Sequence, residues 1–405
     1  MLNKKKIFND PLYGFITLSH DFIFDLVEHP YFQRLRRIKQ LGLTSLVYPG
    51  ALHTRFHHAL GAMHLTTQAI DVIRSKGHNI TEKEALAVKI AILLHDIGHG
   101  PFSHALEGSL VHKVHHEDLS QLFMQRLNKQ YNGKLDLAIQ IFEDNYKKRF
   151  LHQLVSSQLD MDRLDYLTRD SFYTGVSEGV VGFDRIISML NVYDDDLVVD
   201  AKAIYSLEKF IVARRIMYWQ VYLHKTALAA EHLLVHILKR AKELALEGKE
   251  LFGTPVLKEF LYNKYNKKAF EKKPDLLDKF ALLDDYDLTA SIKVWMNHED
   301  KVLAELCKRL INRRLYKILI QEKPFSTNEI KKRQAQAIKT GIDKKHIDYF
   351  VFTGNIQNNA YNPKKDKINM LFKNDEIKDV AEAADLLNIS ALSEPVKKYF
   401  LCYVE

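Results

Sequence analysis

The sequence predicts a mainly α-helical fold with a few short β-strands and a mixed α/β C-terminal lobe. Three observations lead to this prediction. Apolar residues recur at helical spacing in two consecutive segments between residues 58 and 94. A capping box, TEKE at 81–84, opens the second of these segments. The candidate strands are short and scattered. With 405 residues the chain can bury a large core.

The first two helices are predicted from their apolar faces and their ends. One begins at about His58 and turns inward Met63, Ala69, Ile70 and Ile73. The next has Thr81 as N-cap, with Glu84 reaching back to it, and carries apolar residues at Leu86, Ile90, Leu93 and Leu94. Its end is predicted at the helix-breaking residues Gly98, Gly100 and Pro101.

The rest of the chain continues this pattern. Further helices are expected near 116–129, 152–171, 205–248, 255–264 and 300–320. Short strands are expected at 14–18, 197–199, 349–352 and 400–404. Histidines concentrate before about residue 248 and lysine-rich segments after it. We therefore expect a catalytic lobe at 1–248 and a regulatory or assembly lobe at 249–405.

Composition limits the class of protein. No stretch approaches the roughly 18 apolar residues that a membrane span needs, and the basic N-terminus lacks the apolar run of a signal peptide. Cys307 and Cys402 are the two cysteines, too few for a disulfide framework or a thiolate metal site. These features predict a cytoplasmic protein. The formal charge of +8 fits a polyanionic ligand or a solvated lysine-rich surface equally well.

Of the 19 histidines, 11 lie between His53 and His116, which indicates metal or proton chemistry in that part of the chain. A catalytic divalent ion needs hard or borderline ligands and an open position. Two imidazoles and two carboxylates could meet this need: His58, His95, Asp96 and Asp162. Near the last of these, Asp162, Tyr166 and Asp170 recur every four residues, so they share one helix face.

The other histidines of the region are candidates for acid–base catalysis. His99 and His104 follow the predicted ligand pair, and His116 precedes an acidic helical segment. Glu107 could orient an imidazole and raise its basicity. An imidazolium beside a metal-polarised phosphate suits hydrolysis of a phosphate ester or anhydride.

Five segments together resemble a known family. They are NDPLYGFITLS at 9–19, FQRLRRIKQLG at 32–42, YPGALHTRFHHALG at 48–61, LLHDIGHGPFSHALE at 93–107 and DMDRLDYLTRD at 160–170. They resemble the deoxynucleoside triphosphate triphosphohydrolase branch of the HD-domain phosphohydrolases, which includes the sterile-alpha-motif/HD enzyme and bacterial relatives. The resemblance is dense from residue 6 to about 226 and patchy afterwards. It implies an HD-domain helical fold.

The resemblance also implies a reaction and a ligand set. Water attacks the α-phosphate and releases deoxynucleoside and inorganic triphosphate. His58, His95, Asp96 and Asp162 would bind one divalent ion, for which manganese, iron, magnesium, nickel and zinc are all admissible. His116 matches a general acid for the departing nucleoside oxygen, and Glu107 stands where the family has an orienting aspartate. His99 and His104 match active-site histidines near the phosphates.

Substrate contacts follow from the same resemblance. Phosphate contacts would come from Arg55, Arg163, Arg214 and Lys225, with Arg163 at a position where relatives often have lysine. Residues expected around the sugar, where packing against C2′ favours deoxyribose, are Gln40, Leu41, Tyr166, Asp170 and Tyr222.

The resemblance further implies an activating GTP or dNTP bound between subunits of a homo-oligomer, either a dimer or a tetramer. The matching positions are Lys6, Gln33, Arg36, Arg313 and Lys317. Two positions depart from the family pattern, because Glu28 replaces an aspartate and Tyr13 replaces a histidine. A basic helix face explains Arg36 equally well.

Two other functions stay open at this point. The first is an HD phosphohydrolase that acts on another nucleotide, an alarmone or a nucleic-acid end. The second is a regulatory protein that binds nucleic acid on an inactive HD fold. Nucleic-acid binding could also accompany the enzyme as a secondary property, with the salt dependence typical of phosphate contacts.

Overall fold

The computed structural model describes residues 6–102, 110–111, 114–364, 366–385, 389 and 394–405. Within these residues the protein is mainly helical, as predicted, with short strands in small sheets. The first part of the chain contains α1 (Asp21–Glu28), α2 (Pro30–Gln33), α3 (Arg55–Ser75), α4 (Glu82–Leu94), α6 (His116–Gln130), α7 (Asp136–Phe142), α8 (Arg149–Gln153), α9 (Met161–Thr174), α10 (Phe183–Ser188), α11 (Ile204–Met217) and α12 (Lys225–Leu246).

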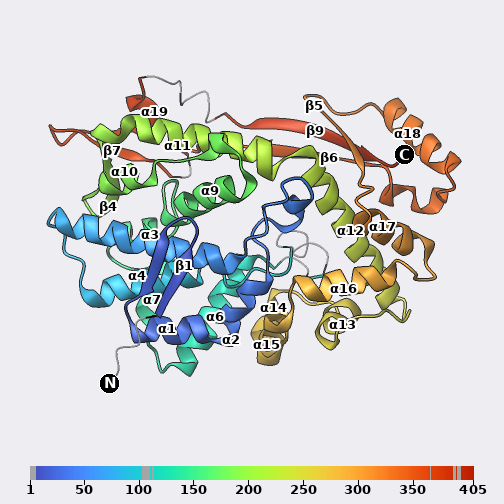
Figure 1. Ribbon diagram of the computed structural model, residues 1–405, viewed down its shortest axis with the longest axis horizontal. Helices are drawn as coiled ribbons and strands as arrows, with labels where there is room; N and C mark the ends of the chain where they lie inside the picture. The colour runs from blue at the N-terminus through green and yellow to red at the C-terminus, as the bar shows by residue number, and fades with distance from the viewer. Residues whose placement is uncertain (1–5, 103–109, 112–113, 365, 386–388, 390–393) are drawn as a thin grey trace.

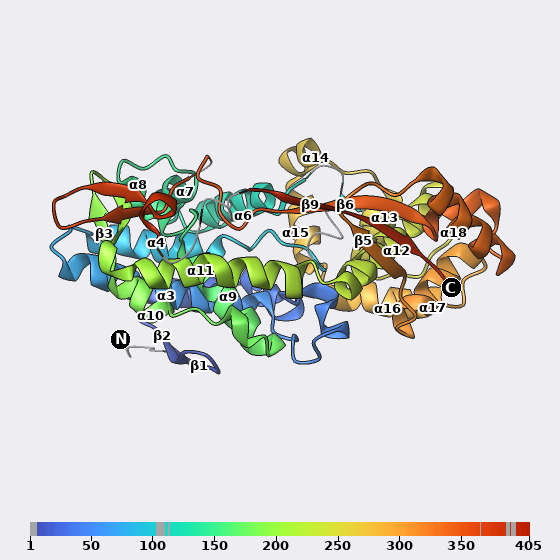
Figure 2. The same cartoon turned by 90° about the horizontal axis from the view of Figure 1, so that it is seen from above.

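The second part contains shorter helices and much of the β-structure. Its helices are α13 (Pro255–Tyr262), α14 (Lys267–Lys272), α15 (Pro274–Leu282), α16 (Asp285–Trp295), α17 (Lys301–Ile311), α18 (Thr327–Lys339) and α19 (Val380–Ala383). Figures 1 and 2 show α13 and α16–α18 gathered at one end of an elongated molecule, with α3 and α4 at the other.

The described residues form three small sheets, and two of these join segments that lie far apart in the sequence. The hairpin of β1 (Lys6–Asp10) and β2 (Gly14–Leu18) is antiparallel. A second sheet has the order β3 (Leu190–Tyr193), β4 (Asp196–Asp200), β7 (Asn369–Leu371) and β8 (Ile377–Asp379), with β4 and β7 parallel. The third has β9 (Val396–Tyr403) between β5 (Lys317–Gln321) and β6 (Phe352–Asn358). The predicted second lobe thus adds two strands, β7 and β8, to the β3–β4 hairpin of the first. The boundary at residue 248 stays a prediction.

The two helices predicted from their apolar faces form, and α3 packs against both α4 and α9. The inward residues predicted for α3 are buried. Helix α4 begins with the predicted capping box between Thr81 and Glu84. Helix α4 ends at Leu94, four residues before Gly98, the first of the residues predicted to end it.

Three predicted helices are interrupted. The segment 152–171 divides into α8 and α9 because Asp160 caps α9 instead of continuing a helix, accepting the Arg163 backbone N–H at 2.7 Å. The segment 205–248 contains a π-helical turn (Tyr218–Tyr222) and a new N-cap at His224. After α17, residues 317–321 form a strand because they pair with β9.

Of the predicted strands, 14–18 is confirmed as β2, and 197–199 lies within β4. The strand predicted at 349–352 begins only at Phe352, after a 3-10 helix (Lys344–Tyr349). The predicted C-terminal strand is longer than expected, because β9 pairs along its length with β6.

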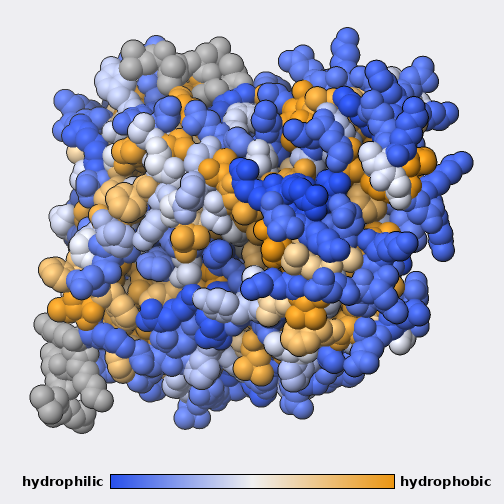
Figure 3. Space-filling model, turned by 45° about the vertical axis from the view of Figure 1, so that its right-hand side comes forward, coloured by the Kyte–Doolittle hydropathy of each residue, from blue (hydrophilic) through white to orange (hydrophobic). Residues whose placement is uncertain are grey.

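No helix in the described part of the chain is both long enough and apolar enough to span a bilayer. On the face seen in Figure 3, hydrophilic side chains predominate and hydrophobic ones lie between them in small groups.

The buried carboxylate of Glu84 provides a test of the α4 N-terminus. Its oxygens accept hydrogen bonds from the Tyr146 hydroxyl at 2.7 Å, the Lys148 ammonium at 2.9 Å and the Thr81 backbone N–H at 2.8 Å. Burial opposes the charge, but these bonds outweigh it and lower the pKa of Glu84 from 4.5 to about 2. The stabilisation is therefore complete above pH 4.5 and is lost as the pH falls toward about 2.

We expect Glu84→Gln to lower the free energy of unfolding by ~2 kcal/mol at neutral pH. Urea unfolding followed by circular dichroism would show this difference shrinking in acid. Glu82→Gln is the matched control because the Glu82 side chain is 91% exposed and its ion pair with Arg74 stabilises little. A Glu84→Gln deficit that is the same at neutral and acid pH would contradict the prediction.

Candidate metal and phosphate site

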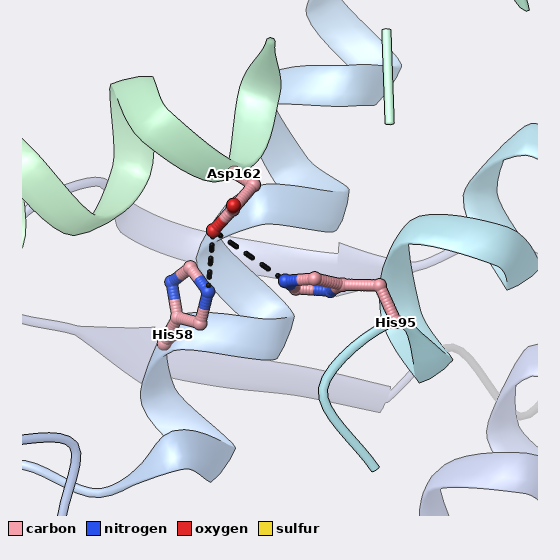
Figure 4. Close-up of side chains that lie close together, drawn as sticks. All are labelled: His58, His95 and Asp162. Atoms are coloured by element: carbon pink, nitrogen blue, oxygen red, sulfur yellow. Dashed lines mark ion pairs between the residues drawn. The ribbon is translucent and has the colours of Figure 1, made fainter. Parts of the chain in front are cut away.

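Three helices bring the predicted metal ligands together (Figure 4). Helix α3 carries His58, the residue after α4 is His95, and the first turn of α9 carries Asp162. Oδ1 of Asp162 lies 3.1 Å from His58 Nε2 and 3.4 Å from His95 Nε2. One ligand atom from each of these three residues could therefore reach a single metal ion.

Asp96 completes the group of four. Its Oδ1 lies 3.4 Å from His95 Nε2, and its Oδ2 lies 3.8 Å from His58 Nε2. Asp96 also forms an ion pair with Arg55, from the first turn of α3. The structure thus brings all four predicted ligands to one place, next to one of the predicted phosphate-binding arginines.

The rings of His58 and His95 are each oriented by a hydrogen bond at Nδ1, the nitrogen that faces away from Asp162. His58 Nδ1 lies 2.7 Å from Asp165 Oδ2, and His95 Nδ1 lies 2.6 Å from the Ile92 carbonyl oxygen. These acceptors favour a proton on Nδ1, so Nε2 is the nitrogen that would bind a metal after losing its own proton. Both Nε2 atoms are buried and have no hydrogen-bond partner among the described residues. The donor set therefore fits a divalent ion.

The electrostatics of the group also favour a cation. Burial disfavours the charged form of His58, but Asp162 and Asp165 outweigh it and raise the pKa of His58 to about 10. Against burial, Asp96 and Asp162 raise the pKa of His95 too. Burial disfavours the carboxylate of Asp162, yet the two histidines keep its pKa below the usual range. The carboxylates of Asp96, Asp162 and Asp165 thus favour positive charge at the two imidazoles, and a divalent cation between them would supply it.

A second cluster adjoins the first. The ring of His116, the first residue of α6, stacks on the ring of His99 with centroids 3.8 Å apart and planes 15° apart. His99 Nε2 lies 3.3 Å from Asp96 Oδ1, so Asp96 links the two clusters. Burial and the nearby Arg55 hold the pKa of His99 well below 6.5. The other two predicted catalytic residues, His104 and Glu107, lie outside the described residues.

Comparison with known proteins identifies the family. The HD domain model matches residues 55–170, and the model of an HD associated region matches residues 181–252. A solved phosphohydrolase from Bacteroides thetaiotaomicron VPI-5482 is 55% identical, with a TM-score of 0.96 over 99% of this chain and 100% of that chain. Uncharacterized protein YwfO of Bacillus subtilis is 33% identical over 95% of this chain and 89% of its own. The chain belongs to the HD-domain phosphohydrolases.

The HD phosphohydrolase also resembles eukaryotic enzymes over part of its length. The deoxynucleoside triphosphate triphosphohydrolase SAMHD1 homolog of Dictyostelium discoideum is 34% identical over 59% of this chain and 50% of its own. Human deoxynucleoside triphosphate triphosphohydrolase SAMHD1 is 29% identical over 59% of this chain and 45% of its own. The chain spans about half the length of these two relatives.

In this HD phosphohydrolase, the side chains of Arg34 and Asp285 hold the loop after α4. The buried guanidinium of Arg34 donates to the carbonyl oxygens of Ile97 at 3.1 Å and His99 at 2.7 Å. Asp285, the first residue of α16, accepts the Phe102 backbone N–H at 3.1 Å and the Lys39 N–H at 3.0 Å. Residues from both halves of the chain therefore position the loop that carries His99.

The same loop packs closely on α6. A Cβ atom at Gly98 would lie 2.2 Å from the His116 carbonyl oxygen and 2.3 Å from the Ser120 backbone nitrogen. The Gly98 N–H donates to the Ser120 hydroxyl at 2.9 Å. Glycine is needed here because only a residue without a side chain lets this loop meet the first turn of α6.

Of the predicted phosphate-binding residues, Arg163 and Arg214 lie near Tyr166, whereas Lys225 lies elsewhere. Arg163 pairs with Asp160, and Arg214 donates to Gln158 Oε1 at 3.1 Å. Burial, and to a lesser extent Tyr218, raises the pKa of Tyr166. The positive charges of Arg214 and Arg163 oppose this rise, which shows that both guanidinium groups lie near the Tyr166 hydroxyl. Lys225, by contrast, is exposed and lines a different surface hollow with Trp219 and Lys398.

Two residues of the stripe predicted along α9, Tyr166 and Asp170, contact Tyr222. Tyr222 donates its hydroxyl to Asp170 Oδ2 at 2.7 Å, and its ring lies edge-on to Tyr166 with centroids 6.1 Å apart. His53 Nε2 lies 2.7 Å from the other Asp170 oxygen. The backbone N–H of Gln40, which precedes Leu41, donates to the His53 carbonyl oxygen at 3.0 Å.

The predicted activator residues lie in two separate parts of the chain. Lys6 on β1 pairs with Glu28, and Gln33 accepts a hydrogen bond from Arg36 at 2.9 Å. Later in the chain, Arg313 donates to the Leu46 carbonyl oxygen at 2.9 Å, and Lys317 lies on β5. A site that uses both sets therefore stays a prediction.

Sequence reasoning missed several residues that shape the site. His53, Arg34 and Asp285 carry no recognisable local signal, because their partners lie far along the chain or are backbone groups. Asp165 had one available signal. It lies four residues before Arg169, which is the spacing of an ion pair on one helix face.

Proposed function

We propose that this HD phosphohydrolase hydrolyses deoxynucleoside triphosphates to deoxynucleosides and inorganic triphosphate. One observation carries the proposal: the metal-ligand group adjoins Arg55, and its member Asp162 lies on the helix that also carries Tyr166 and Asp170. Such a site offers positive charge for several phosphates and an aromatic, hydrogen-bonding surface for a sugar. The SAMHD1 relatives, which are deoxynucleoside triphosphate triphosphohydrolases, support the same substrate class.

His58, His95, Asp96 and Asp162 would hold the divalent ion. When bound, such an ion supplies Lewis acidity toward phosphate oxygens and water. The donor set admits manganese, iron, magnesium, nickel and zinc. Measuring the metal content of the purified protein would identify the ion.

The chain's own residues would bind the substrate and move the proton. Arg55, Arg163 and Arg214 would neutralise the triphosphate, since guanidinium groups match phosphate oxygens in charge and geometry. The P–O5′ bond breaks as a water oxygen joins the α-phosphorus, and the water loses one proton to solvent, from which His116 would regain its own. His116 would donate its proton to the departing O5′, which leaves as the 5′-hydroxyl of the deoxynucleoside.

Product analysis tests the proposal. Each dNTP and each NTP is incubated with the Mn²⁺-supplemented protein, and nucleoside, monophosphate, diphosphate and triphosphate products are separated. We expect deoxynucleoside and intact triphosphate from dNTPs, with little reaction of NTPs. Release of orthophosphate or pyrophosphate, or turnover of nucleoside monophosphates or nucleic-acid ends alone, would overturn it. Salt-sensitive nucleic-acid binding without hydrolysis would favour the regulatory function instead.

We also propose that a GTP or dNTP activates the enzyme at an interface between subunits, using Lys6, Gln33 and Arg36 with Arg313 and Lys317 of a second copy. In this arrangement residues 249–405 serve assembly. The proposal predicts a lag or sigmoidal rates that added GTP removes, together with a nucleotide-dependent increase in molar mass. Hyperbolic rates on every single dNTP, with no response to GTP, would contradict it.

A further inference from the structure

Behind His58, three charged side chains form a buried chain that leads to the N-terminal hairpin. Asp165 Oδ2 lies 2.7 Å from His58 Nδ1, and both Asp165 oxygens accept hydrogen bonds from Arg169, at 3.0 and 2.9 Å. Arg169 donates from its remaining Nη1 to Asp10 Oδ2 at 2.7 Å. The side chains of His58, Asp165 and Arg169 are 0% exposed, and that of Asp10 is 4% exposed.

Asp10 ends this chain at the turn of the hairpin. Its Oδ1 accepts the backbone N–H groups of Leu12 at 3.0 Å and Tyr13 at 3.1 Å, while its Oδ2 meets Arg169. The Tyr13 ring lies 5.3 Å from the Arg169 guanidinium. One carboxylate therefore shapes the hairpin and fixes the far end of the ion-pair chain.

The packing around Asp165 and Arg169 leaves no room for displacement toward α3. A Cβ atom at Gly61, one turn after His58 on α3, would lie 2.0 Å from Asp165 Oδ1 and 2.2 Å from Arg169 Nη2. Glycine inside a helix ordinarily costs stability. This glycine lets α3 and α9 approach closely enough for the Asp165–His58 contact.

We propose that Asp165, Arg169 and Asp10 are positioning residues for the metal ligand His58, so that the N-terminal hairpin forms part of the metal site. The inference rests on the metal site of the proposed function. Asp165 holds the His58 proton on Nδ1 and turns Nε2 toward Asp162. Arg169 fixes the rotamer of Asp165 by binding both of its oxygens, and Asp10 anchors Arg169.

A purely structural ion-pair cluster would stabilise the fold without affecting the affinity for metal. The positioning role predicts a change at the metal instead, because loss of a carboxylate that orients a ligating histidine typically weakens metal binding about 10–100-fold. Asp10 is separated from His58 by three successive contacts, so its effect on metal affinity should have the same direction and a smaller size.

The test measures metal affinity in the absence of nucleotide. Chelator-treated full-length protein is titrated with Mn²⁺ by electron paramagnetic resonance, and the absorption spectrum of the Co²⁺ form reports the ligand geometry. The variants are Asp165→Asn, Asp10→Asn and Gly61→Ala. Gly61→Ala removes no charged group and would ordinarily favour a helix. Asp379→Asn is the matched control. Asp379 is a buried carboxylate that caps the start of α19 and accepts a hydrogen bond from the Tyr361 hydroxyl.

We expect Asp165→Asn and Gly61→Ala to weaken Mn²⁺ binding about 10–100-fold and to change the Co²⁺ spectrum, with a smaller loss for Asp10→Asn and none for the control. Folded Asp165→Asn and Gly61→Ala proteins with wild-type affinity and spectrum would overturn the inference. If Asp165→Asn fails to fold, the other two variants decide by the same criterion. A wild-type protein that binds no divalent ion would instead overturn the metal site itself.

Discussion

Replacing Asp162 with alanine should abolish stable metal binding and lower phosphohydrolase activity by ~10³-fold or more. Asp162 Oδ1 is the atom that both predicted histidine ligands approach, at 3.1 and 3.4 Å. Its removal takes away one ligand and the negative charge that favours a cation between the imidazoles. The fold should survive, because Asp162 lies at the edge of the core, with its side chain 24% exposed.

Metal content after dialysis, activity and the circular dichroism spectrum check this expectation together. Asp184→Ala is the control, since Asp184 is an exposed carboxylate in the first turn of α10. A folded Asp162→Ala protein that keeps its metal and full activity would remove Asp162 from the ligand set.

Replacing His116 with alanine should lower turnover about 10²–10⁴-fold while the metal stays bound. His116 stacks on His99 at the start of α6, and His99 in turn contacts Asp96. His116 is therefore next to the metal-ligand group without belonging to the cluster of His58, His95 and Asp162. A general acid at this place would protonate the leaving oxygen.

The leaving group separates acid catalysis from a structural effect. A nucleotide ester with a 4-nitrophenolate leaving group needs little proton donation, so His116→Ala should lose much less activity on it than on a dNTP. His115→Ala, a change at the exposed neighbouring histidine, serves as the control for perturbation of the α6 N-terminus. Equal losses on both substrates would contradict the general-acid role.

Local sequence signals predicted those elements whose ends depend on their own residues. The capping box at Thr81 and Glu84 places the start of α4, and the residues spaced along α3 face the core as expected. The helix predicted over residues 300–320 was wrong at its end, because residues 317–321 are stabilised as a strand by β9, about eighty residues later in the chain. Helical periodicity contains no information about such a partner.

The candidate site shows the same division. Residue type and spacing singled out His58, His95, Asp96 and Asp162, and the structure places them within reach of one another. Their assignment as ligands stays a prediction that metal analysis must test. The contacts that hold the loop after α4 could not be predicted from sequence, because Arg34 binds backbone carbonyl groups and Asp285 binds backbone N–H groups.

By itself, the sequence determined the helical class, the chemical types gathered between residues 53 and 170, and the family to which they point. Tertiary structure alone decided how those groups are held. Gly98 and Gly61 were readable only as helix-breaking or flexible residues, yet each is required by a backbone or side chain from another helix. Asp10 became part of the site through Arg169. The physical reason is that propensity and periodicity act over a few residues, whereas close packing and buried ion pairs depend on partners brought together by the whole fold.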